Sequence, residues 1–133
     1  MKIGILGAGS WGSALANLLA YNGHEVTIWS IDQKEIEMLR EFHEQKDRLP
    51  GVILNTSIAY TTDLETVVTD KEMIVCAVPS PFVRGTAAKI ARYIKEGQLI
   101  VNVSKGIEEA TLKALVEVIE EEIPVANVAV LSG

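Results

Sequence analysis

The chain opens with a short apolar run that leads directly into a Gly-x-Gly-x-x-Gly motif at Gly7, Gly9 and Gly12. Apolar residues at helical spacing follow from Ser13. A strand, a glycine turn and a helix in this order are typical of a dinucleotide-binding site. Gly7 permits the tight turn, Gly9 lets a pyrophosphate approach the backbone, and Gly12 allows the helix to pack closely on the sheet. The helix N-terminus adds free N–H groups and a dipole that favours an anion.

Strand and helix patterns alternate along the whole chain, which predicts right-handed crossovers and a parallel sheet. The expected strands are 2–6, 25–29, 57–60, 73–78, 98–103 and 127–131. The expected helices are 10–22, a helix capped by Asp32 that ends near Glu44, a short helix from Asp63, 81–94 and 111–122. We therefore expect an α/β fold of the Rossmann type, doubly wound, with a mainly parallel sheet in the order 3-2-1-4-5-6 and helices on both faces.

Two helices carry more detailed expectations. Glu35 lies three residues after Asp32, the spacing of a capping box, and the apolar face of that helix should include Ile36, Leu39 and Phe42. Gly23 is placed to end the first helix. The first helix should bury four apolar residues, namely Ala14, Leu15, Leu18 and Leu19.

Composition limits the kinds of partner. The chain has 133 residues and a net charge of −6, without a cluster of Lys and Arg. We therefore expect a single dinucleotide-binding domain over residues 1–133 that repels nucleic acid and anionic membrane surfaces. An anionic cofactor then needs local backbone groups and one or two well-placed cations to bind it.

The sequence also predicts the location of the protein. It lacks a signal peptide and an apolar run of membrane-spanning length, and its single cysteine, Cys76, fits a reducing cytosol. We therefore predict a cytoplasmic protein without membrane insertion.

The end of the second expected strand should read the adenosine ribose. Counting about 20 residues from the last glycine leads to Asp32, whereas the first position after the strand is Ser30. We favour Ser30, because the ribose lies at the strand tip, and we interpret Asp32 as a helix cap. Ser30 can bind a 2′-hydroxyl without repelling a 2′-phosphate, and Lys34 could reach such a phosphate. The choice between NAD and NADP therefore stays open.

Two further strand ends carry polar residues. Pro79 and Ser80 follow the fourth expected strand, with Arg84 one turn into the next helix, and Lys105 follows the fifth. At these tips the residues could meet a nicotinamide cofactor and the substrate, Lys105 through its ammonium group. The alternative without a ligand is that Pro79 ends a strand, Ser80 caps a helix and Lys105 is a solvated surface lysine.

The sequence does not predict a metal site, because His24 and His43 lack metal-like spacing to other ligands.

In combination, several motifs resemble the bacterial-type NAD(P)-dependent glycerol-3-phosphate dehydrogenases. They are 7–12 (GAGSWG) with 14–16 (ALA), 22–26 (NGHEV), 49–51 (LPG), 78–80 (VPS) with Arg84, 104–106 (SKG) and 131–133 (LSG). The resemblance spans the whole chain. It implies reversible hydride transfer between dihydroxyacetone phosphate and sn-glycerol 3-phosphate, a small-molecule substrate pair, with supply of glycerol phosphate for phospholipid synthesis.

The resemblance also implies roles for individual residues. Ser10, Trp11 and Ile31 would contact the dinucleotide, Lys105 would contact cofactor and substrate, and Gly133 would begin a substrate-contacting segment. Position 31 is often basic or polar in the family, and position 48, here Arg48, is commonly aromatic. Both departures bear on cofactor affinity and choice.

The chain ends directly after an expected strand, so we expect a fragment that lacks a helical C-terminal substrate domain. By resemblance, the general acid/base lysine lies in that domain, and we predict no catalytic residue and no useful turnover in this chain alone. An apolar face left uncovered can also support a homodimer. Two alternatives remain: a non-catalytic module that senses NAD(H), and another two-domain dehydrogenase of the same superfamily.

Overall fold

Six parallel strands form one sheet in the order β3-β2-β1-β4-β5-β6 in the computed structural model, which describes residues 1–131. The strands are β1 (Lys2–Leu6), β2 (Glu25–Trp29), β3 (Ala59–Thr61), β4 (Met73–Cys76), β5 (Leu99–Asn102) and β6 (Asn127–Val130). All five neighbouring pairs are parallel. The predicted strand order is confirmed, and it reverses direction between β1 and β4. In doubly wound sheets, ligands bind beyond the strand ends at this reversal.

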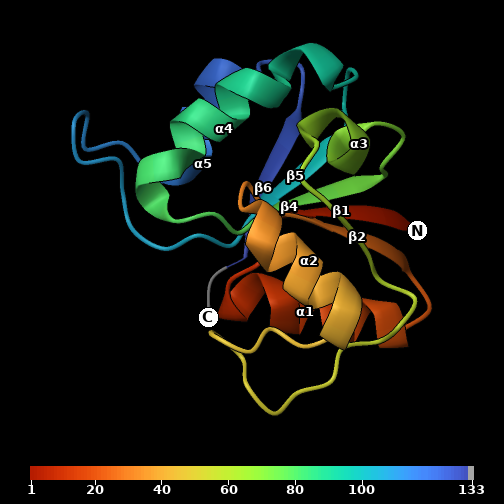
Figure 1. Cartoon of the computed structure of the whole chain (residues 1–133). Coiled ribbons are helices and arrows are strands. Elements are labelled where there is room, and N and C mark those ends of the chain that lie inside the picture. Colours follow the sequence, from red (N-terminus) through yellow and green to blue (C-terminus); the bar gives the residue numbers. More distant parts are fainter. Residues whose placement is uncertain (132–133) are drawn as a thin grey trace.

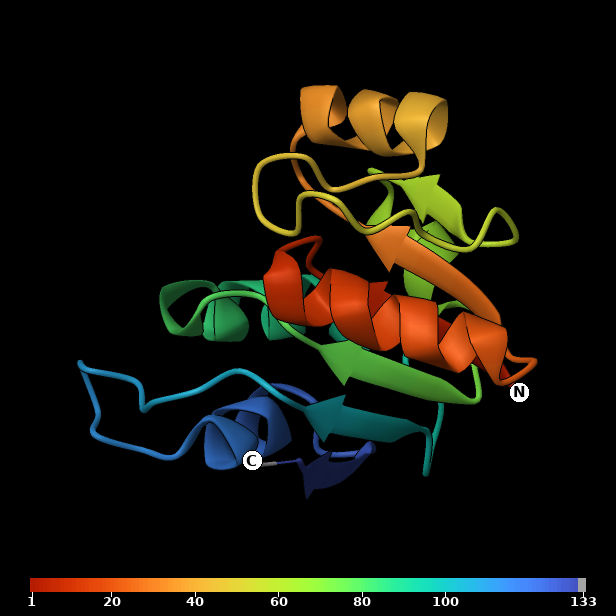
Figure 2. The ribbon, with the colours of Figure 1, turned by 90° about the horizontal axis from the view of Figure 1, so that it is seen from below.

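Helices cover both faces of the sheet, as Figures 1 and 2 show. They are α1 (Ser10–Tyr21), α2 (Gln33–Phe42), α3 (Leu64–Val68), α4 (Val83–Ile90) and α5 (Leu115–Glu122), with short 3-10 turns at Ser80–Phe82 and Ala91–Tyr93. In Figure 1, α1 and α2 lie on one side of the sheet, and α3, α4 and α5 lie on the other. The predicted Rossmann-type fold is therefore confirmed. None of the helices within residues 1–131 is long and apolar enough to cross a membrane.

The two faces carry separate apolar cores. Ile3 and Ile5 of β1 pack with α1 and α2, whereas Leu6 and Ile74 pack with α3, α4 and α5. Strands that are buried on both faces need continuous apolar runs, and β1 and β4 have them. Position 4 of β1 is a glycine for a steric reason, because a Cβ there would lie 1.9 Å from the carbonyl oxygen of Val67 in α3.

The expected apolar face of α1 needs correction. Leu18 is 58% exposed, and Ala14, Leu15 and Leu19 are only partly buried. The helix instead turns its small residues to the sheet, and its buried residues are Gly12, Ser13, Ala16 and Ala20. Small side chains allow the helix axis to come closer to the strands than a row of leucines would.

The start of α2 also differs in detail from the expectation. Asp32 caps the helix, as predicted, by accepting a hydrogen bond from the N–H of Lys34 at 2.9 Å. The N–H of Asp32, however, donates to the hydroxyl of Ser30 at 3.1 Å, so Glu35 does not complete a capping box. The helix ends at Phe42, which is 46% exposed rather than part of the core.

Several element boundaries shift from the predicted ones. Strand β3 begins at residue 59, and the expected helix 81–94 consists of α4 between two 3-10 turns. The expected helix 111–122 begins only at Leu115. An antiparallel bridge joins Ile107 to Ala114, and Leu112 has a positive φ of 61°, so this segment forms a turn instead of a helix. Figure 1 shows the resulting loop, in light blue, extending away from the end of the sheet.

Candidate functional site: a cleft at the ends of the central strands

A cleft of about 1330 Å³ lies at the carboxyl ends of the central strands. It is lined by nine of the residues that the sequence singled out, namely Gly7, Gly9, Ser10, Trp11, Gly12, Ser30, Ile31, Pro79 and Lys105. The tenth, Gly133, lies outside the described residues. The structure therefore gathers at one edge of the sheet residues that are almost 100 positions apart in the sequence.

Two of the three motif glycines are required by the fold itself. Gly7 has a φ of +114°, and a Cβ there would lie 2.8 Å from the carbonyl oxygen of Ala77. A Cβ on Gly12 would lie 2.3 Å from the carbonyl oxygen of Gly7. Any side chain at either position would therefore collide with backbone.

Gly9 is different, because the fold leaves room for a side chain there. Its φ is −69°, which any residue can adopt. Among residues 1–131, a Cβ at this position would come within 4 Å only of the Arg48 side chain, at 3.9 Å from its Cδ. A glycine that the fold does not require, and that borders a cleft, fits a site where a ligand approaches the backbone.

The N-terminus of α1 opens onto the same space. Gly9 is the N-cap and provides no side-chain oxygen for the N–H groups of the first turn, which contains no acidic residue. These groups and the helix dipole favour a negatively charged ligand. The residues present therefore fit a pyrophosphate.

The charges around the cleft differ from those of the chain as a whole. The chain carries a net charge of −6. The charged side chains that line the cleft are Arg48, Lys89 and Lys105 against Asp32 and Glu35, three positive and two negative. An anion therefore meets a slight local excess of positive charge in an otherwise acidic protein.

A hydrogen-bond network joins the end of β2 to the glycine turn. The hydroxyl of Ser30 donates to Oε1 of Glu35 at 2.6 Å. The amide of Gln45 donates to Oε2 of Glu35 at 2.9 Å and to the carbonyl oxygen of Ala8 at 2.5 Å. Sequence reasoning missed both Glu35 and Gln45 as site residues. The isolated polar Gln45 carried no motif signal, although it is fully buried in the structure.

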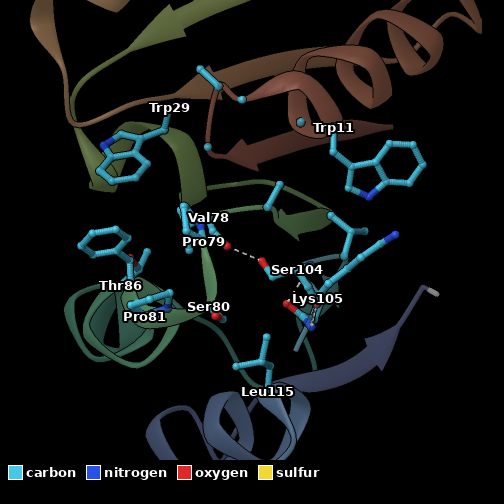
Figure 3. Close-up of a pocket in the computed structure, with 18 of the residues that line it drawn as sticks. Trp11, Trp29, Val78, Pro79, Ser80, Pro81, Thr86, Ser104, Lys105 and Leu115 are labelled. Atoms are coloured by element: carbon cyan, nitrogen blue, oxygen red, sulfur yellow. Dashed lines mark hydrogen bonds between the residues drawn. The ribbon is translucent and has the colours of Figure 1, made fainter. Parts of the chain in front are cut away.

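The ends of β4 and β5 are tied together beside the cleft. The hydroxyl of Ser104 donates to the carbonyl oxygen of Val78, as Figure 3 shows, and the side chain of Asn102 exchanges two hydrogen bonds with the backbone of Ser104. Lys105 follows at once and is exposed at the cleft. Pro79 lies next to Val78 on the neighbouring strand end (Figure 3).

Arg84 has a structural role that the sequence did not indicate. Its guanidinium donates to Glu108 at 2.6 Å, to Glu121 at 2.8 Å and to Glu122 at 2.7 Å. These bonds connect α4 with α5 and with the loop that follows Lys105. The arginine lowers the pKa of Glu108 to about 2, mainly by hydrogen bonding to the carboxylate. Because its guanidinium binds three carboxylates, Arg84 holds this loop against the helices rather than binding a cofactor.

The two tryptophans lie on opposite sides of the cleft (Figure 3). Trp11 is 49% exposed, whereas Trp29 is 7% exposed and its indole N–H donates to the carbonyl oxygen of Thr62 at 3.0 Å.

The single cysteine, Cys76, is buried, and burial raises the pKa of its thiol to about 11. Within residues 1–131, no cluster of three or more His, Cys, Asp or Glu side chains could hold a metal ion.

Comparisons with known proteins agree with this architecture. Residues 2–133 match the family model described as "NAD-dependent glycerol-3-phosphate dehydrogenase N-terminus". Two curated relatives are named glycerol-3-phosphate dehydrogenase [NAD(P)+]. The protein from Agathobacter rectalis is 57% identical over 99% of this chain, and the protein from Fusobacterium nucleatum is 47% identical over 100% of it. The chain spans 39% and 40% of the length of these relatives.

A solved structure gives the same result. The crystal structure of glycerol-3-phosphate dehydrogenase from Coxiella burnetii matches 99% of this chain, and 40% of its own chain, with a TM-score of 0.92 and 29% identity. The resemblance inferred from the motifs is thus confirmed. The expected cofactor class, NAD or NADP, is also confirmed, because the family and its relatives are named for these cofactors. The chain belongs to the family of NAD-dependent glycerol-3-phosphate dehydrogenases, whose N-terminal part it matches.

Proposed function

We propose that the cleft binds NAD(H) or NADP(H) with the pyrophosphate over Gly9. We further propose that the chain is the cofactor-binding part of an enzyme that interconverts dihydroxyacetone phosphate and sn-glycerol 3-phosphate by hydride transfer. The observation that carries the proposal is the open position at Gly9, where the fold itself leaves room for a side chain. Gly9 lies at the N-terminus of α1, in a cleft where the strand order reverses. This combination of open backbone, helix dipole and reversal point supports a dinucleotide site.

The proposed roles of the other residues follow the cleft. Ser10, Trp11 and Ile31 would contact the dinucleotide from the side of α1 and β2, and Pro79 from the end of β4. Lys105 would contact both cofactor and substrate, since its ammonium group suits a phosphate or a carbonyl oxygen. Ser30 lines the cleft with its hydroxyl already bonded to Glu35.

The role of the whole enzyme extends the proposal. The substrates would be small phosphate esters, and the product would supply phospholipid synthesis. Five further points remain predictions. They are substrate binding at Gly133, a helical substrate domain with the general acid/base lysine, a homodimer, the absence of nucleic-acid binding and a cytoplasmic location. The family match favours a glycerol-3-phosphate dehydrogenase over an NAD(H)-sensing module or another two-domain dehydrogenase.

Calorimetric titration of the chain with NADH and with NADPH tests the binding proposal. We expect saturable binding of at least one dinucleotide. Gly9→Ala should weaken that binding at least tenfold, because the methyl group occupies the place of the pyrophosphate, while the urea midpoint of unfolding stays close to that of the wild type. Gly85→Ala adds the same methyl group to the cleft lining on α4 and serves as the matched control.

Two results would contradict the binding proposal. One is a folded wild-type chain that binds neither dinucleotide. The other is a Gly9→Ala variant that binds as tightly as Gly85→Ala.

The proposed activity is tested separately, in an enzyme that contains this chain. NADH or NADPH oxidation should depend on dihydroxyacetone phosphate, and not on a 2-oxo acid or a nucleotide sugar.

A further inference from the structure

We propose that Glu35 reads the adenosine ribose and gives this site a preference for NADH over NADPH. Its carboxylate would accept the hydrogen bond of the ribose 2′-hydroxyl, in the place that the sequence indicated for Ser30. The proposal rests on the dinucleotide site proposed above and names the residue that selects between the two cofactors.

The hydroxyl of Ser30 is already engaged. It donates its one proton to Oε1 of Glu35 at 2.6 Å and accepts the N–H of Asp32 at 3.1 Å. Ser30 is also only 6% exposed. Since a hydroxyl has a single proton, Ser30 has no further hydrogen bond to donate without breaking this pair. Its role is to hold Glu35 against the end of β2.

Glu35, by contrast, keeps acceptor capacity toward the cleft. Among residues 1–131, Oε1 accepts one side-chain hydrogen bond from Ser30 and Oε2 accepts one from Gln45. A carboxylate oxygen can accept two, so each oxygen retains a site. The side chain is 18% exposed and lines the cleft next to the tip of β2, where acidic residues of dinucleotide-binding folds bind the ribose.

Gln45 fixes the distance between the two halves of the site. Its amide is fully buried, and it donates to Glu35 and to the carbonyl oxygen of Ala8 in the glycine turn. The carboxylate for the ribose and the turn for the pyrophosphate therefore belong to one hydrogen-bonded unit. Such a unit is pre-organised for two groups of a single ligand.

The charges at this end disfavour a 2′-phosphate. Such a phosphate would approach the carboxylates of Glu35 and Asp32, both of which line the cleft. The cation facing Glu35 is Arg48, with its Nε 4.0 Å from Oε2 and its side chain 61% exposed. Lys34 lies in the first turn of α2 and adds a second positive charge nearby. Arg48 and Lys34 are both exposed, so solvent screens their charges, whereas the Glu35 side chain is only 18% exposed and its charge is screened less.

The experiment measures the ratio of the Kd values for NADPH and NADH in the chain and its variants. Glu35→Gln removes the negative charge and keeps the size of the side chain. Glu37→Gln removes the same charge from an exposed residue of α2 that does not line the cleft and whose carboxylate accepts a hydrogen bond from Gln33, and it is the matched control. A ratio within one variant does not change with the folded fraction, so partial unfolding cannot imitate the effect.

We expect the wild type to bind NADH more tightly than NADPH. Glu35→Gln should lower the NADPH-to-NADH ratio about tenfold, because a like-charge contact with the 2′-phosphate is lost, while Glu37→Gln should leave it unchanged. A wild-type preference for NADPH, or equal ratios in the two variants, would overturn the role of Glu35. Failure of the wild type to bind either dinucleotide would instead contradict the proposed site itself, and the role of Glu35 with it.

Discussion

A Cβ on Gly12 would lie 2.3 Å from the carbonyl oxygen of Gly7, so the first turn of α1 can approach the glycine turn only without a side chain. This contact separates two functions within one motif. Gly7 and Gly12 allow the turn and the helix to pack, whereas Gly9 leaves space above the backbone.

Gly12→Ala should therefore destabilise the fold, in contrast to Gly9→Ala. Overpacking against backbone typically costs about 1–3 kcal/mol, and we expect a loss of that size in the free energy of unfolding measured in urea. Gly85→Ala in α4 is the control, because no atom of residues 1–131 lies within 4 Å of its Cβ position. There alanine should raise helix stability by up to about 1 kcal/mol. Equal unfolding midpoints for the two variants would show that the backbone at Gly12 adapts to a side chain.

Acrylamide quenching should report on Trp11 and not on Trp29. Both tryptophans line the cleft, but Trp11 is 49% exposed whereas Trp29 is only 7% exposed. Acrylamide should therefore quench mainly Trp11, and saturation with NAD⁺ should protect it. In Trp11→Phe the remaining emission should resist acrylamide with or without NAD⁺. Strong quenching in that variant would mean that Trp29 is more accessible than the structure indicates.

The ion pairs of Arg84 should make stability depend on pH. The pKa of Glu108 is lowered from 4.5 to about 2 in the folded state. A lowered carboxyl pKa contributes stability above the unfolded pKa, and this contribution is lost as the pH falls from about 4.5 toward about 2. Arg84→Met should therefore destabilise the chain more at pH 6 than at pH 3, as measured by urea midpoints.

The exposed pair of Lys95 and Asp70 provides the control for this pH effect. Their side chains are 77% and 70% exposed and 3.4 Å apart, so solvent screens them. Lys95→Met should shift the urea midpoint little at either pH. If the difference between wild type and Arg84→Met were the same at pH 6 and pH 3, the carboxylates would not be the source of the stabilisation.

Cys76 should be unreactive in the folded chain. The thiol is buried in β4, and burial raises its pKa to about 11, so the thiolate is scarce at pH 8. Labelling with a thiol reagent at pH 8 should be slow under native conditions and fast in denaturant. Saturating dinucleotide should slow native labelling further if labelling requires unfolding. Fast labelling of the native chain would show that β4 opens locally.

The sequence by itself determined the strand order, the glycine turn and the position of the cleft. These follow from short-range patterns, namely continuous apolar runs in β1 and β4, helical periodicity between strands, and glycines at fixed spacing. Parallel topology then brings the strand ends to one edge, which is why their places in the sequence suffice to predict that Pro79 and Lys105 lie near the glycine turn.

Only the tertiary structure decided how the side chains are shared among partners. Glu35 has the spacing of a capping box, but in the structure it accepts hydrogen bonds from Ser30 and Gln45. Arg84 follows a strand tip in the sequence, but in the structure it binds Glu108 and two glutamates of α5. Such contacts join residues up to 38 positions apart, and their partners depend on distance and burial. A one-dimensional pattern contains neither quantity, so the choice among competing hydrogen-bond partners is made only when the chain is packed.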